Sequence, residues 1–144
     1  IYNLHFPSNF NDIQMRIESF DLLRDLLKSN KEPSIALGDF NLSSKDDTKL
    51  NIYNNQQDIW YVSHLEGCED CKGTSYYGYD KTWSFLDAIF ISRDRGIEFN
   101  RKSIQLHKTE FNSYADTGRP IRFNAKARKG VSDHFAVAAE VVIN

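Results

Sequence analysis

The chain has 144 residues, a formal net charge of −2 and a hydrophobic content of 40%. This length allows one domain, and the composition is typical of a globular protein. No apolar run is long enough for a transmembrane helix, and the net charge does not by itself indicate a nucleic-acid binder. The sequence leaves the cellular location open.

The first 38 residues predict a strand, a helix and a second strand. Ile1–His5 and Ser34–Gly38 have the apolar character of short strands. Between them, apolar residues recur at helical spacing from Ile13 to Leu27, and Asn9 or Asn11 is expected to cap this helix. The opposite, polar side of the helix carries Arg16, Glu18, Asp21, Arg24, Asp25 and Lys28. This order of elements indicates an α/β layer, with the helix on one face of a sheet.

The remaining elements are shorter. Ser43 or Ser44 is expected to cap a second helix that runs to about Tyr53, before a polar loop over Asn54–Asp58. Aromatic and β-branched residues predict four further strands, at Trp60–His64, Thr74–Tyr77, Phe85–Ser92 and Val137–Ile143. Glu98–Leu106 is ambiguous. Phe111–Gly130 has the polar, Gly- and Pro-containing character of a long surface loop.

Polar side chains interrupt or border three of the apolar runs. Asp39 and Asn41 follow one buried strand, Asp87 lies within another, and Asp133 and His134 precede the last. Burying even a neutral polar group without a partner costs roughly 2–7 kcal/mol. We therefore expect these side chains to partner one another around a shared site, which could include a metal ion.

The motifs that contain these residues resemble those of the endonuclease/exonuclease/phosphatase superfamily, the deoxyribonuclease-I-like phosphodiesterases. Gly38–Asn41, Leu86–Phe90 and Ser132–His134 occur in the order of that family, preceded by Asn3–Ser8 as its Asn-x-His segment. Each motif alone is common in turns or at the ends of strands. Together they match the C-terminal half of the family domain over residues 1–144. The N-terminal half, which carries the metal-binding glutamate of the family, has no match here.

The resemblance implies a fold and a set of roles. The fold would be α/β: half of a four-layer sandwich, with a mixed, mostly antiparallel sheet and helices on one face. His134 would act as general base, a role that suits histidine near neutral pH, and Asp87 would orient it. Asp39 would orient the attacking water or bind a metal ion, and Asp133 is the best candidate ligand for Mg²⁺, with Mn²⁺ as an alternative. Asn41 would bind a phosphoryl oxygen, and His5 would bind the phosphate or assist the leaving group.

The substrate remains open at this point. A basic segment without an acid leads into the Ser-Asp-His motif and consists of Arg119, Arg122, Lys126, Arg128 and Lys129. This segment favours nucleic acid as the substrate. The alternative for the same residues is a solvated basic loop. A phospholipid or inositol-phosphate substrate is the second hypothesis, and a non-catalytic binding module without the metal glutamate is the third.

Two further features carry expectations. Cys68 and Cys71 are two unreactive thiols or a local disulfide, with half of a zinc site as a weaker alternative. The strands Ser34–Gly38, Phe85–Ser92 and Val137–Ile143 are apolar almost throughout, so burial is expected on both faces. We therefore expect either the N-terminal half or a second copy of the chain to cover this sheet, and the 144 residues alone to be inactive. His64 and His107 match no motif and are expected to be structural.

Overall fold

The computed structural model describes residues 1–144 as three α-helices, one 3₁₀ turn and eight strands. None of the helices has the length and apolar character needed to cross a membrane. The elements are β1 (Tyr2–His5), α1 (Ile13–Ser29), β2 (Ile35–Asp39), α2 (Ser44–Leu50), η1 (Asn54–Gln56), β3 (Trp60–Val62), α3 (Ser63–Glu66), β4 (Ser75–Tyr77), β5 (Thr82–Ser84), β6 (Asp87–Ser92), β7 (Ile97–Leu106) and β8 (Val137–Ile143).

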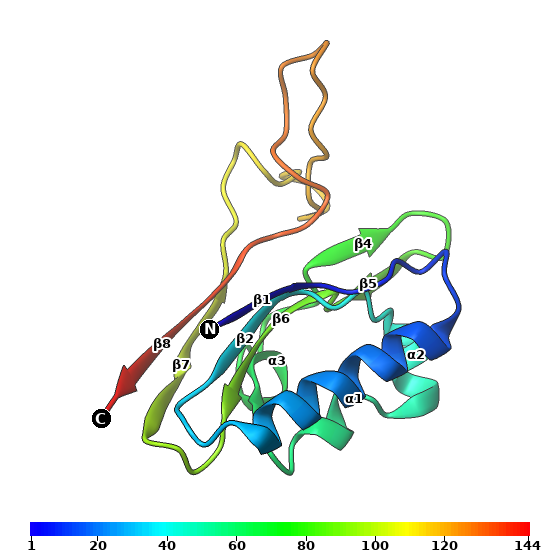
Figure 1. The fold of residues 1–144 in the computed structure, drawn as a ribbon. Coiled ribbons are helices and arrows are strands. Elements are labelled where there is room, and N and C mark those ends of the chain that lie inside the picture. The colour runs from blue at the N-terminus through cyan, green and yellow to red at the C-terminus, as the bar shows by residue number, and fades with distance from the viewer.

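A four-stranded sheet in the order β1-β2-β6-β3 forms the centre of the molecule. Only β1 and β2 are parallel, whereas β6 is antiparallel to both β2 and β3. Two antiparallel ribbons, β4–β5 and β7–β8, stand beside this sheet. Helices α1 and α2 lie on one side of the sheet and the β7–β8 ribbon lies on the other (Figure 1). The predicted α/β class, with a mixed and mostly antiparallel sheet, is confirmed.

The hydrophobic core lies between α1 and the sheet. Phe20 and Leu23 of α1 pack against sheet residues such as Phe90, and all three side chains are buried. Phe40, just after β2, is fully buried at the centre of this cluster. Its ring stacks on Phe90 at 4.5 Å and meets Phe6 edge-on at 5.1 Å. Burial of aromatic rings in such contacts dominates the energetics of a small core.

The boundaries of α1 and α2 correct two expectations and agree with a third. Asp12, and neither Asn9 nor Asn11, caps α1, because its carboxylate accepts the backbone N–H of Gln14 at 2.9 Å. Helix α2 is capped by Ser43, as one alternative predicted, but it ends at Leu50 and not near Tyr53. Asn51 follows in the left-handed conformation (φ 54°), which commonly terminates helices.

Arg16 was expected on the polar face of α1, but it is only 2% exposed. Its guanidinium group donates a hydrogen bond to the carbonyl of Ser8 at 2.8 Å and lies 3.4 Å from the Asp46 carboxylate. The alkyl stem of an arginine can be buried while its head meets polar partners, so a charged residue does not always mark a solvent-facing helix surface. Arg16 thereby ties the β1–α1 loop and α2 to the side of α1.

The remaining strands differ from the prediction in detail. The strand expected at Trp60–His64 ends at Val62, and the short helix α3 follows it. The ambiguous segment Glu98–Leu106 is strand β7, whereas residues 111–130 contain no helix or strand, as expected for a long loop. The prediction that β8 is buried on both faces is wrong, since Val142 and Ile143 are 59% and 62% exposed. The reason is that β8 pairs only with β7, in a two-stranded ribbon.

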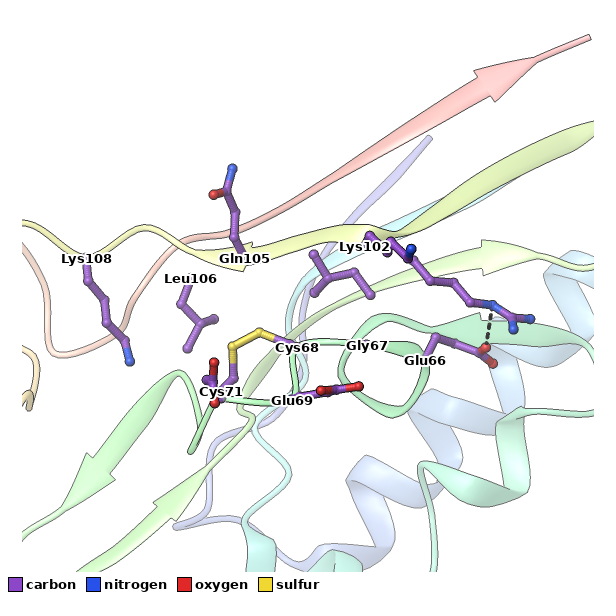
Figure 2. A pocket seen from close by; sticks show the side chains of 12 residues that line it. Glu66, Gly67, Cys68, Glu69, Cys71, Lys102, Gln105, Leu106 and Lys108 are labelled. Carbon is purple, nitrogen blue, oxygen red and sulfur yellow. Dashed lines mark ion pairs between the residues drawn. A yellow bond between two sulfur atoms is a disulfide. The ribbon is translucent and has the colours of Figure 1, made fainter.

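Cys68 and Cys71 are joined by a disulfide, so their sulfur atoms are not available as zinc ligands. Figure 2 shows this disulfide in the loop that follows α3, opposite Leu106 and Lys108 of the segment at the end of β7. A pocket of about 570 Å³ lies between the two segments. The loop starts at Gly67, where an added Cβ would collide with the carbonyl oxygen of Arg101. The loop is therefore held close to β7 at its beginning.

His64 makes the stability of the fold depend on pH. Its ring stacks on Phe85 at 4.3 Å and meets Tyr53 edge-on at 4.6 Å, and burial lowers its pKa from 6.5 to about 4. Below pH 6.5 the unfolded chain binds a proton that the folded chain excludes until about pH 4. This difference is expected to remove about 2–4 kcal/mol of unfolding free energy between those pH values.

His64→Phe is expected to flatten this part of the pH profile, because phenylalanine keeps the stacking and does not bind a proton. The measurement is chemical denaturation of both proteins at several pH values between 7 and 4. His107→Phe serves as the matched control, since His107 is exposed. An equal loss of stability in the wild type and in His64→Phe would contradict the prediction.

Candidate active site

Three polar side chains lie in one row across the central sheet. His5 of β1 pairs with Asp39 of β2, and Asp39 pairs with Asp87 of β6. Successive side chains of a strand point to opposite faces of a sheet. Ala88, the neighbour of Asp87, belongs to the core beneath α1, so the row lies on the face opposite that core. The strand register itself therefore brings these residues together.

His134 reaches this row from the segment before β8. Its Nδ1 atom lies 2.9 Å from Oδ2 of Asp87 and 4.0 Å from Oδ2 of Asp39. His5 lies at the other side of Asp39, with Nε2 3.7 Å from the same Oδ2 atom. His134 and both aspartates are about a fifth exposed, whereas the His5 side chain is 76% exposed. The expected contact between His134 and Asp87 is thus present, with Asp39 beside it.

The surroundings of His134 favour its protonated form, and those of Asp39 disfavour its ionised form. The Asp87 contact raises the pKa of His134 above its usual value, against the opposing effect of burial. Burial raises the pKa of Asp39, the nearby Asp87 charge adds to this shift, and a hydrogen bond from the Asn41 N–H opposes it. Two carboxylates so close together repel each other, so a cation at this position would be stabilised.

Asn41 and Asp133 are placed differently from these residues. Asn41 is buried, and its side-chain amide donates to the carbonyl of Phe6 at 2.9 Å. In this arrangement Asn41 joins the ends of β1 and β2, and its role toward a phosphoryl oxygen stays a prediction. Asp133 is 61% exposed and its carboxylate lies 3.8 Å from Nε of Arg122. Its role as a metal ligand also stays a prediction.

A metal ion fits the side chains of the row. Asp39, Asp87 and His134 each offer a ligand atom, and these atoms lie within 4.8 Å of one another. Oδ2 of Asp87 is buried and accepts no hydrogen bond of good geometry. Nδ1 of His134 lies 2.9 Å from this oxygen. Mg²⁺ prefers carboxylate oxygens and needs only one or two of them from the protein. Asp39, predicted as a ligand, lies within the group, whereas Asp133 does not belong to it.

The basic and aromatic segments lie at one end of the sheet. Residues 121–130 extend away from the body of the molecule as the orange loop of Figure 1, and their basic side chains are exposed. Arg119, by contrast, lies over the ring of Tyr76 at 4.7 Å. Tyr76 pairs with Trp83 across β4 and β5, and Trp83 stacks on the buried Phe135 beside His134. These aromatic residues pack the sheet next to the site.

Comparison with known proteins identifies the fold. No protein-family model matches the sequence, and no curated protein matches it. Among solved structures, a mannosyl-6-phosphatase from Bacteroides thetaiotaomicron is 22% identical with a TM-score of 0.60, and the match covers 98% of this chain and 50% of that one. An endonuclease/exonuclease/phosphatase family protein from the same species is also 22% identical, with a TM-score of 0.62 and coverages of 99% and 49%.

A conserved protein of unknown function from Enterococcus faecalis is 18% identical, with a TM-score of 0.62 and coverages of 99% and 49%. The chain thus spans about half of the length of the solved structures that it matches. Its fold is that of about half of an endonuclease/exonuclease/phosphatase domain, as the motifs predicted.

Proposed function

We propose that this chain is the C-terminal half of a metal-dependent phosphoesterase of the endonuclease/exonuclease/phosphatase superfamily. The observation that carries the proposal is the ion-pair contact of 2.9 Å between His134 and Asp87, beside Asp39 and on the open face of a sheet with this fold. A histidine held by a carboxylate is an arrangement suited to general base catalysis.

In this proposal each side chain has a distinct role. The Nδ1–H of His134 faces the Asp87 carboxylate, which holds the proton on Nδ1 and leaves Nε2 free to take a proton from the attacking water. Asp39 orients that water or holds the metal ion, and Asp133 is the second proposed ligand. A bound Mg²⁺ or Mn²⁺ would neutralise charge that develops on the phosphoryl group. His5, the most exposed member of the row, would bind the phosphate or assist the leaving group.

Nucleic acid is the substrate that we propose first, because the exposed basic residues after Arg119 would attract a phosphate backbone. A phosphorylated small molecule is the second candidate, and one solved structure of this fold is a mannosyl-6-phosphatase. A sugar phosphate and an inositol phosphate are phosphomonoesters, and a phospholipid head group is joined through a phosphodiester; all three present a phosphoryl group that a metal ion and a general base could act on. The other half of the domain, or a second copy of the chain, is the proposed partner that would cover the sheet and complete the site.

The test uses the complete protein that contains this chain. It is incubated with single-stranded and duplex DNA, RNA, mannose 6-phosphate and an inositol phosphate, with Mg²⁺, with Mn²⁺ and with a chelator. Hydrolysis that requires the divalent ion and is lost in Asp39→Asn supports the proposal, and the substrate that is cleaved selects between the candidates. Hydrolysis that survives the chelator, or no hydrolysis of any phosphoester, would refute it. The 144 residues alone are expected to be inactive.

The basic loop gives a further prediction. If nucleic acid is the substrate, replacing Arg122, Lys126 and Arg128 with alanine is expected to weaken DNA binding and to flatten its salt dependence. Each lost phosphate contact reduces the log–log slope on duplex DNA by about 0.9. The measurement is a titration of fluorescent DNA at several salt concentrations.

Lys31, Lys45 and Lys49, which are exposed on the helical side of the molecule, supply a control of equal charge. Their replacement by alanine is expected to leave the slope nearly unchanged. Equal effects of the two triple variants would show that net charge alone governs binding, and the loop would then have no specific role.

A further inference from the structure

Thr74 lies between the two segments that supply Asp87 and His134. It is fully buried, with an exposed fraction of 0%, and it directly precedes β4. Its side-chain Oγ1 atom accepts the backbone N–H of Asp87 at 3.1 Å. Its backbone carbonyl accepts the N–H of Phe135, the residue after His134, at 2.8 Å. One residue therefore binds the backbone of Asp87 and the backbone of the residue next to His134.

Neighbouring contacts fix Thr74 itself. Its N–H donates to the carbonyl of Ser84 at 2.9 Å, and its hydroxyl can donate to the same oxygen at 3.4 Å. The next residue, Ser75, forms an isolated bridge with His134, and its hydroxyl donates to the carbonyl of Asp133 at 3.3 Å. Hydrogen bonds to Ser84 of β5 thus fix the position of Thr74. The bonds of Thr74 and Ser75 then fix the backbone of Asp87 and of the segment that carries His134.

We propose that Thr74 is a positioning residue. Its hydroxyl holds the backbone of Asp87 in the position from which the Asp87 carboxylate contacts His134. Its catalytic consequence rests on the function proposed above, whereas its effect on the geometry of the pair does not. A hydroxyl is suited to this place because it accepts one hydrogen bond and donates another. Valine has nearly the same shape and lacks both capacities, so it would leave the Asp87 N–H without its acceptor.

The experiment compares Thr74→Val with Thr74→Ser in the complete protein. Nitrogen-15 NMR of the imidazole, at a pH where the ring is neutral, reports which nitrogen of His134 carries the proton. In the wild type and in Thr74→Ser the proton is expected on Nδ1, facing Asp87. Thr74→Val is expected to shift a measurable fraction to Nε2 and to lower kcat by at least about tenfold, since a displacement of 1 Å can cost about 10²-fold. KM is expected to change little.

The matched control is Thr82→Val, the same substitution at an exposed threonine of β5. It is expected to change neither the tautomer nor kcat. If Thr74→Val does not fold, Thr74→Cys replaces it, because a thiol of similar size is a weaker acceptor, and an intermediate effect is expected.

Two outcomes would overturn the proposal: an unchanged tautomer and kcat in Thr74→Val, or an equal loss in Thr74→Ser. Failure of the proposed function looks different. A complete protein that hydrolyses no phosphoester, yet whose His134 tautomer shifts in Thr74→Val, would keep the positioning role and remove the catalytic interpretation.

Discussion

Replacing His134 with asparagine is expected to lower kcat of the complete protein for phosphoester hydrolysis by about 10²–10⁴-fold, the usual contribution of a general base. Asparagine retains polarity and fills part of the same space, but it cannot take a proton from water near neutral pH. The His134 ring lies 2.9 Å from Asp87 and 4.0 Å from Asp39, so the substitution removes the imidazole that these two carboxylates contact. The measurement is steady-state kinetics on whichever of the candidate phosphoesters the complete protein hydrolyses.

His107→Asn is the matched control, because His107 is exposed and lies in no predicted motif. It is expected to retain wild-type kcat and KM. Asp87→Asn should reproduce most of the loss, since an amide can present its NH₂ group to the imidazole and favour the wrong tautomer. Wild-type turnover in His134→Asn would remove the general-base role, whichever substrate is cleaved.

Replacing Phe40 with alanine is expected to lower the free energy of unfolding by about 3–5 kcal/mol. Phe40 is fully buried, and its ring contacts Phe6, Phe20, Tyr53 and Phe90 within the core. The cavity left by alanine would face rigid strands and α1, which limits its collapse. Equilibrium denaturation by urea, followed by tryptophan fluorescence, measures the loss.

Phe10→Ala provides the comparison at a fully exposed phenylalanine in the β1–α1 loop. It is expected to change the stability by less than about 0.5 kcal/mol, as is usual for surface substitutions. Phe40→Leu should fall between the two, because most of the apolar volume is kept. A loss below about 1 kcal/mol in Phe40→Ala would show that the core can repack around this position, contrary to our description.

The sequence predicted the site best where local patterns and strand periodicity agree. Asp39 and Asp87 each follow or begin an apolar run, and the need to partner buried acids predicted that they would meet. The helix α1 followed from its apolar spacing, because Phe20, Leu23 and Leu27 form one buried face. The helix depends on residues close in the chain, whereas the meeting of Asp39 and Asp87 was predicted from the need to partner buried acids and from the order of the motifs.

Other contacts between distant segments belong to no recognisable motif and could not be predicted. Thr74 carries no sequence signal for its bonds to Asp87 and Phe135, because these come from the tertiary arrangement of three segments. The helical pattern predicts that Arg16 faces solvent, and only the fold shows that it bonds the carbonyl of Ser8 in the β1–α1 loop. Likewise, the exposure of β8 follows from its pairing with β7 alone, and the apolar sequence of β8 predicted burial.

The cross-strand row makes the site intolerant of changes in chain length. His5, Asp39 and Asp87 meet only because their three strands are aligned at one position. Deleting or inserting one residue within β2 would turn Asp39 toward α1 and place an apolar neighbour in the row, since side chains alternate along a strand. Length variation among related chains should therefore collect in the loops, such as residues 111–130, while the spacing inside β1, β2 and β6 stays fixed. For a protein engineer, the loops are the places to insert new sequence.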